Sequence, residues 1–104
     1  MLELRPNCEL CDRDLPPDSA EARICSYECT YCADCVETIL HNVCPACGGT
    51  FVPRPIRPRH AWRAGKMLGL RYHPASTTRR HSPFSAEEIA DHSARIRDLP
   101  PDQR

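Results

Sequence analysis

The stretch from residue 24 to residue 49, ICSYECTYCADCVETILHNVCPACGG, holds six of the chain's eight cysteines. The other two, Cys8 and Cys11, form a short-spaced pair upstream. The full pattern is C-x2-C-x13-C-x3-C-x2-C-x2-C-x8-C-x2-C. Because zinc prefers four soft ligands in a tetrahedron, eight thiols at these spacings predict two closed sites of four cysteines each.

The spacing by itself leaves two pairings of the cysteines open. In a sequential arrangement the first four cysteines bind one ion and the last four bind the other. In a cross-brace, the first and third pairs share one ion, and the second and fourth pairs share the other. A ferredoxin-like iron–sulfur cluster is the weaker interpretation, because eight residues separate Cys35 from Cys44 where a ferredoxin run has three.

The order of short and long gaps resembles that of RING-type domains. Cys44-Pro45-Ala46-Cys47 matches their usual C-P-x-C ending, and Leu10 stands where they carry an apolar residue inside the first pair. The resemblance implies a small metal-stabilised α+β fold of the RING-like (treble-clef) cross-brace kind. It implies the following ligands: Cys8, Cys11, Cys32 and Cys35 in site 1, and Cys25, Cys29, Cys44 and Cys47 in site 2.

Two positions depart from the RING pattern. The fourth ligand is usually His and is here Cys29, and Gly48-Gly49 stand where ubiquitin-ligase RING domains often have a basic residue. The resemblance therefore supports the metal geometry more strongly than it supports ligase activity.

A second resemblance covers more of the chain. The run MLELRPNCELCDRDLPPDSAEARICSYECTYCADC, together with CPACGG, is similar to the bacterial domain of unknown function family 1272, over roughly residues 1–57. This resemblance implies a bacterial origin and zinc binding, and it implies no activity.

The remaining sequence predicts the elements around the cysteines. Residues 1–52 contain too few large apolar side chains to build a core without a cross-link or metal. Residues 1–7 could form a short strand or an arm, and short strands are expected at Ala22–Cys25 and Thr50–Val52. Cys32–His41 is the helix candidate, since Val36, Ile39, Leu40 and Val43 recur at helical spacing.

The charge changes sign halfway along the chain. Residues 1–52 carry three Arg and nine Asp or Glu, whereas residues 53–104 carry eleven Arg or Lys and five Asp or Glu. We treat residues 53–83, rich in Pro and Arg, as a basic segment that is either an extended, mobile tail or packs on the acidic half. Nucleic acid could bind its eight cations: Arg54, Arg57, Arg59, Arg63, Lys66, Arg71, Arg79 and Arg80.

The sequence of residues 84–99 predicts a helix that begins with a capping box. Ser85 is the expected N-cap with Glu88 at N3, and the helix should end near Arg97 before Pro100-Pro101. Its apolar stripe of Ile89, Ser93 and Ile96 is thin, so we expect it to dock on another surface.

These patterns favour a protein-interaction module with two structural Zn²⁺ ions per chain and no enzymatic activity, because four thiolates leave no open position on an ion. The alternatives are a nucleic-acid-binding accessory protein and a RING-type ubiquitin ligase or a relic of one. Eight unpaired thiols and the lack of an apolar leader or spanning run favour a cytoplasmic protein without a membrane partner.

Overall fold

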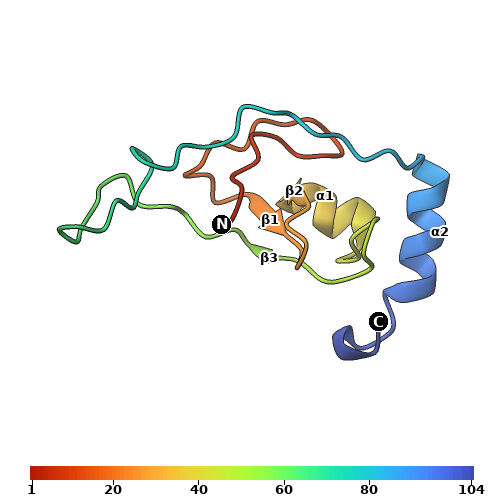
Figure 1. Ribbon diagram of the computed structural model, residues 1–104. Helices are drawn as coiled ribbons and strands as arrows, with labels where there is room; N and C mark the ends of the chain where they lie inside the picture. The colour runs from red at the N-terminus through yellow and green to blue at the C-terminus, as the bar shows by residue number, and fades with distance from the viewer.

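Three short antiparallel strands lie at the centre of the molecule, in the order β2-β1-β3. They are β1 (Ala22–Ile24), β2 (Thr30–Cys32) and β3 (Val52–Pro53). The computed structural model describes all residues from 1 to 104 and measures 49 × 28 × 19 Å. A loop projects at one end of the long axis and helix α2 stands at the other (Figure 1).

The predicted helix after Cys32 is present, in two parts. Helix α1 (Ala33–Cys35) begins at Cys32, whose thiol accepts a hydrogen bond from the Cys35 N–H, and continues into a π-helical turn, η1 (Val36–Leu40). The turn ends at His41, whose φ of 50° is left-handed. Such a residue cannot continue a right-handed helix, so His41 acts as the C-cap.

The predicted strands are partly confirmed. The expected strands at Ala22–Cys25 and Thr50–Val52 correspond to β1 and β3. Residues 1–7 form no strand beyond an isolated bridge between Asn7 and Asp14. Strand β2 was not expected, because its three residues lie between closely spaced cysteines and show no strand-like alternation.

The core contains eleven buried residues, and five of them are cysteines. Tyr31 of β2 packs edge-on against Phe51, with ring centroids 5.5 Å apart. Such T-shaped pairs are favourable beyond their area of contact. The apolar side chains thus fill the spaces between thiols, and no separate hydrophobic core exists.

The basic segment (residues 53–83) packs on the first half of the chain. The Ser76 N–H donates to the Leu4 carbonyl at 3.0 Å, and the Ser82 N–H donates to the Glu9 carbonyl at 2.7 Å. The part of the segment around Ser76 and Ser82 therefore contacts the acidic half, as one of the two alternatives predicts.

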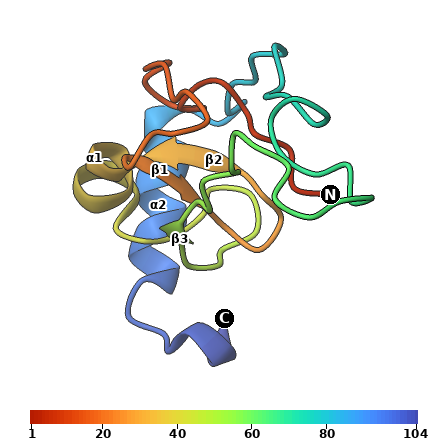
Figure 2. The same ribbon diagram turned by 90° about the vertical axis from the view of Figure 1, so that its left-hand side faces the viewer.

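Helix α2 (Ala86–Ile96) has the predicted capping box, with both reciprocal hydrogen bonds between Ser85 and Glu88. It ends at Arg97, and a 3-10 turn, η2 (Pro101–Gln103), follows. Viewed along the long axis, α2 stands behind the sheet (Figure 2). None of the helices combines the length and the apolar character needed to cross a bilayer.

Candidate metal centre

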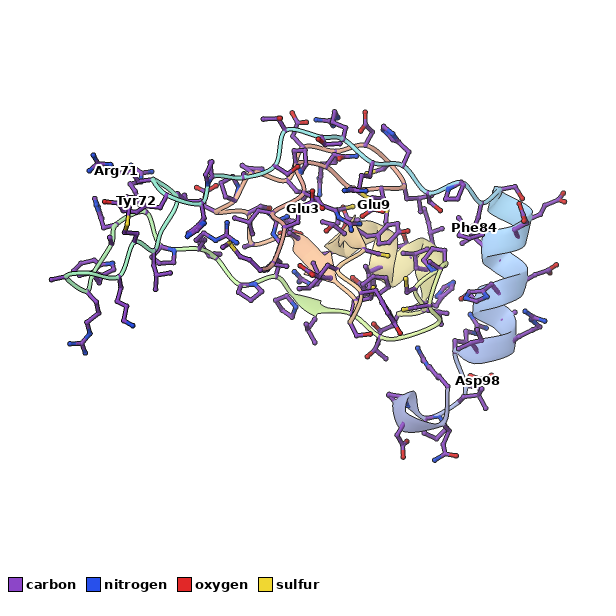
Figure 3. The ribbon with its side chains drawn as sticks, viewed as in Figure 1. Glu3, Glu9, Arg71, Tyr72, Phe84 and Asp98 are labelled. Atoms are coloured by element: carbon purple, nitrogen blue, oxygen red, sulfur yellow. The ribbon has the colours of Figure 1, made fainter.

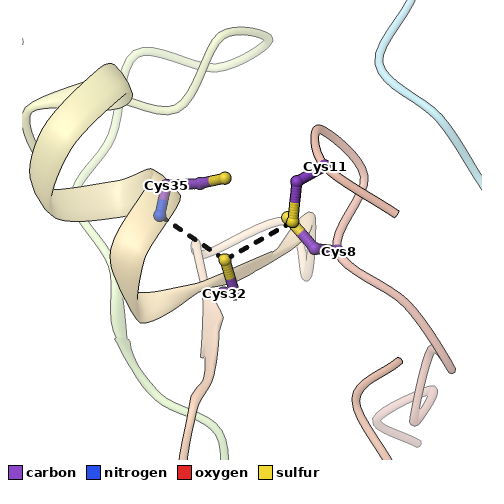
Figure 4. Close-up of side chains that lie close together, drawn as sticks. All are labelled: Cys8, Cys11, Cys32 and Cys35. Carbon is purple, nitrogen blue, oxygen red and sulfur yellow. Dashed lines mark hydrogen bonds between the residues drawn. The ribbon is translucent and has the colours of Figure 1, made fainter. Parts of the chain in front are cut away.

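The thiols of the first and third cysteine pairs form one group, the first cluster. The Sγ atoms of Cys8, Cys11, Cys32 and Cys35 all lie within 4.8 Å of one another. Cys11 Sγ lies 3.7 Å from Cys32 Sγ (Figure 4). Three of the four residues are buried and Cys11 is exposed, so the cluster lies at the edge of the core.

The second cluster forms from the second and fourth pairs. The Sγ atoms of Cys25, Cys44 and Cys47 lie within 4.8 Å of one another. Cys29 does not approach all three that closely, but Cys25 and Cys44 are near enough to shift its pKa. The second cluster is therefore less tightly gathered than the first.

The two clusters interleave along the chain. Cys32 and Cys35 lie with Cys8 and Cys11, although Cys25 and Cys29 come between the two pairs in sequence. A sequential pairing would place Cys25 with Cys8, and these two thiols lie in different clusters. Each cluster joins two segments that are distant in the chain.

Backbone N–H groups point at the sulfurs, as expected for turns that hold thiolates. The Cys35 N–H lies 3.5 Å from Cys32 Sγ, and the Gly49 N–H lies 3.4 Å from Cys47 Sγ. The Tyr27 N–H lies 3.4 Å from Cys25 Sγ. These donors stabilise a negative sulfur, and hydrogen bonds of this kind to the ligating atoms are typical of metal sites.

The thiols of the second cluster perturb one another strongly. Hydrogen bonds from Cys29 and then Cys44 lower the pKa of Cys25 to about 2. The resulting thiolate raises the pKa of Cys29 to about 11 by hydrogen bonding. Hydrogen bonds with Cys25 and Cys29 also raise the pKa of Cys44. The cluster therefore holds one negative charge easily, and further ionisation requires a cation.

The chemistry of the donors fits a soft divalent metal. Thiolates are the ligands that Zn²⁺ prefers in closed tetrahedral sites, and the ion supplies the positive charge that lets neighbouring thiols ionise together. Both clusters are thus positioned as possible metal sites.

A family model described as "Protein of unknown function (DUF1272)" matches residues 1–57. The chain belongs to the DUF1272 family. An uncharacterised protein of Rhizobium meliloti (strain 1021) is 57% identical over 79 residues, which cover 76% of this chain and 84% of the relative. No solved structure matches the chain.

The DUF1272 match includes all eight cysteines and the sheet, and helix α2 lies outside it. In this DUF1272 chain α2 nevertheless covers the second cluster. His92 Nε2 lies 3.0 Å from the Cys44 carbonyl oxygen, and Ser93 Oγ donates to the Leu40 carbonyl at 2.9 Å. The predicted stripe on α2 faces this contact, with Ile89 and Ser93 buried.

Glu9, inside the first cysteine pair, has a role that the sequence did not reveal. Its carboxylate accepts the Thr30 N–H at 2.6 Å and the Arg5 guanidinium at 2.8 Å, and Glu9 is only 8% exposed. The carboxylate therefore ties the Cys8–Cys11 turn to the start of β2. An acidic residue between Cys8 and Cys11 is visible in the sequence. Its partner Thr30 could not be identified there, because it is 21 residues away.

The eight cations proposed to bind nucleic acid divide into two groups. Arg54 is buried, and Arg57 donates to two backbone carbonyls. Arg79 pairs with Asp12 and Asp14, and Arg80 with Glu3. The other four are exposed and form no ion pair: Arg59, Arg63, Lys66 and Arg71.

Proposed function

We propose that the two clusters bind structural Zn²⁺ in a RING-like cross-brace and that the chain is a zinc-organised protein-interaction module. The observation that carries this proposal is the division of seven of the eight cysteines between two interleaved clusters, with Cys29 beside the second. With Cys29 as the fourth ligand of the second cluster, each ion has four thiolates.

Four thiolates per ion argue for structural sites. A catalytic zinc keeps one position open for water or substrate, and no cysteine is left over to act as a free nucleophile. Because five cysteines belong to the eleven-residue core, the ions would supply the cohesion that apolar burial cannot. We therefore propose no catalytic role for either site.

The cysteine-rich half offers apolar side chains to a protein partner. Tyr27, next to the second cluster, is 74% exposed, and Val52 on the edge strand β3 is 56% exposed. Aromatic side chains held on a rigid support are typical of interface centres. The zinc sites would hold these side chains in place without contacting the partner.

Ligase activity has little support at the position after the last cysteine. Gly48 has a φ of +79°, and a Cβ there would lie 3.4 Å from Ile96 Cδ1 of α2. A basic side chain would be strained at this backbone angle and would meet α2. We expect no ubiquitin discharge in an assay with a charged conjugating enzyme; robust discharge would favour the ligase alternative.

Native mass spectrometry of the purified chain tests the metal part of the proposal. Two zinc ions per chain are expected. One ion per chain, or iron with visible absorbance, would contradict it.

For the interaction part, the zinc-loaded chain and its Tyr27→Ala variant serve as matched baits against extracts of a bacterial host. A partner that binds the first and not the second supports an interface at Tyr27, whereas equal capture by both contradicts it.

A further inference from the structure

The basic segment contains a loop that stands away from the body of the molecule (Figure 1). We call residues 58–72 the tip loop. Its neck is closed by the Leu70 N–H, which donates to the Pro58 carbonyl at 2.9 Å. At Gly69, with φ of +108°, a Cβ would lie 3.0 Å from the His60 carbonyl oxygen, so only glycine fits between the two arms.

The base of the tip loop is anchored by one side chain. The Arg57 guanidinium donates to the His73 carbonyl at 2.7 Å and to the Leu2 carbonyl at 2.6 Å. Both ends of the loop are thereby fixed to the N-terminal segment. The loop is held in one orientation, with its tip pointing away from the acidic half.

Three large apolar side chains on the tip loop face solvent. Trp62 is 80% exposed, Met67 65% and Leu68 57%. The four unpaired cations Arg59, Arg63, Lys66 and Arg71 belong to the same loop. No Asp or Glu occurs anywhere between Pro53 and Ala86. A protruding loop that combines exposed apolar groups with cations alone suits an anionic, partly apolar partner.

We infer that the tip loop binds the surface of an anionic lipid bilayer. Trp62, Met67 and Leu68 would enter the interface between headgroups and acyl chains, and the cations would meet the lipid phosphates. This contact is peripheral, so it needs no membrane-spanning run. It goes beyond the proposed protein-interaction function and adds a second surface at the opposite end from α2.

A bilayer explains the loop better than a nucleic acid does. Single-stranded nucleic acids stack their bases on successive aromatic rings, and Met67 and Leu68 cannot serve as stacking platforms. The Arg71 guanidinium lies over the Tyr72 ring, 5.7 Å from its centroid. The guanidinium therefore occupies one face of that ring. Figure 3 shows these two side chains together on the loop. Trp62 is exposed but has the His60 ring edge-on beside it, with ring centroids 6.1 Å apart, so the loop offers no row of free aromatic faces.

The chain contains one tryptophan, so its fluorescence reports directly on the tip loop. The zinc-loaded full chain is titrated with vesicles of phosphatidylcholine and phosphatidylglycerol, and with vesicles of phosphatidylcholine alone. We expect a blue shift and quenching by brominated lipid with the anionic vesicles, and binding to neutral vesicles at least about tenfold weaker. The absence of a blue shift with anionic vesicles would overturn the inference.

Matched variants separate the two parts of the contact. Arg63→Gln with Lys66→Gln, and Met67→Ser with Leu68→Ser, should each weaken binding about tenfold while Trp62 remains as the probe. Arg95→Gln with Arg97→Gln removes the same charge from the α2 end and should leave binding unchanged. Zinc stoichiometry verifies that each variant is folded.

Two further outcomes would contradict the inference. An equal loss of binding in the α2 control would show that net charge alone is responsible. Fluorescence quenching by single-stranded oligonucleotides, without any response to anionic vesicles, would assign the tip loop to nucleic acid.

Discussion

Arg54 is the charged side chain of the basic segment that the fold takes into its interior. It is 4% exposed, and burial lowers the pKa of its guanidinium. The guanidinium donates to the carbonyls of Arg5, Leu15 and Pro16 at 2.8–3.2 Å. One side chain after β3 therefore satisfies three backbone acceptors on either side of the first cysteine pair.

Replacing Arg54 should destabilise the whole chain. In Arg54→Met the three carbonyls lose their donor, and we expect the free energy of unfolding to fall by about 3 kcal/mol. Denaturant unfolding of the zinc-loaded chain measures this change. Arg59→Met, on the exposed tip loop, is the control and should have almost no effect. A similar small change in both variants would show that Arg54 is not a structural link.

The looser position of Cys29 predicts an asymmetry between ligands of the second cluster. In Cys29→Ser, the three remaining thiols still lie within 4.8 Å of one another, so the ion should stay bound with lower affinity. In Cys44→Ser, this compact group of three is broken and the second ion should be lost. Chelator competition and native mass spectrometry measure both. Equal loss of zinc in the two variants would contradict the asymmetry.

Helix α2 packs beside the second cluster, although its residues lie outside the range that the family model matches. Its first turn is closed by Ser85 Oγ, which accepts the Glu88 N–H at 3.1 Å, and by Glu88 Oε1, which accepts the Ser85 N–H at 3.0 Å. At its other end, Arg104 donates to the Asn42 carbonyl at 2.8 Å. The capping box thus closes the first turn, and Arg104 fixes the chain that follows the helix beside the Cys44–Cys47 turn.

Removing the N-cap should loosen α2 before the rest of the chain. Ser85→Ala eliminates the capping acceptor, and we expect the helix to lose about 1 kcal/mol of stability. Hydrogen exchange should accelerate at the α2 amides, with little change in the sheet. Glu87→Gln, in the same turn but outside the capping box, is the control. Equal exchange rates in Ser85→Ala and the unmodified chain would contradict this role.

The contact between the basic segment and the first cysteine pair should depend on pH. Hydrogen bonds from Arg79 and then His81 lower the pKa of Asp12. A lowered pKa means that the interaction is fully present above the unfolded-state pKa and is lost as pH falls through the folded-state pKa. NMR shifts of the Arg80 and Ser82 amides should follow this titration and should not do so in Asp12→Asn. Identical pH profiles in both chains would contradict the prediction.

In the molecule as a whole, the unpaired cations and the cysteine-rich core lie in different regions. The acidic half contains the cysteine clusters, whereas four exposed cations without ion pairs lie on the tip loop: Arg59, Arg63, Lys66 and Arg71. Nearly half of the buried core consists of thiols. Outside the DUF1272 match, α2 and residues 73–83 pack on a body whose stability we attribute to metal.

Metal removal should therefore unfold the chain as a whole. A strong chelator, or acid that protonates the thiolates, should abolish the dispersed NMR spectrum, and zinc should restore it. Helix α2 should melt as well, because an isolated helix of 11 residues is marginal in water. A chain that keeps its dispersed spectrum after verified metal loss would show that the clusters are not the source of stability.

The sequence alone predicted the candidate metal ligands, the helix after Cys32 and the capped helix that begins at Ser85. These features depend on short-range spacing. Thiols with two or three residues between them can converge on one ion, and a capping box spans a single turn. The likeness to DUF1272 was likewise visible in the cysteine pattern, and the family match confirms it.

The structure was needed to show where the basic segment runs and which of its cations stay free, and it places the first and third cysteine pairs together as the RING resemblance implied. Arg54 looked like the other arginines of the segment. Its burial depends on carbonyls 38 to 49 residues away, which no local pattern reveals. For the same reason the cysteine spacing left the partners of Cys32 and Cys35 open, and only the resemblance to RING-type domains implied that they join the first pair. Long-range contacts place both Arg54 and these thiols.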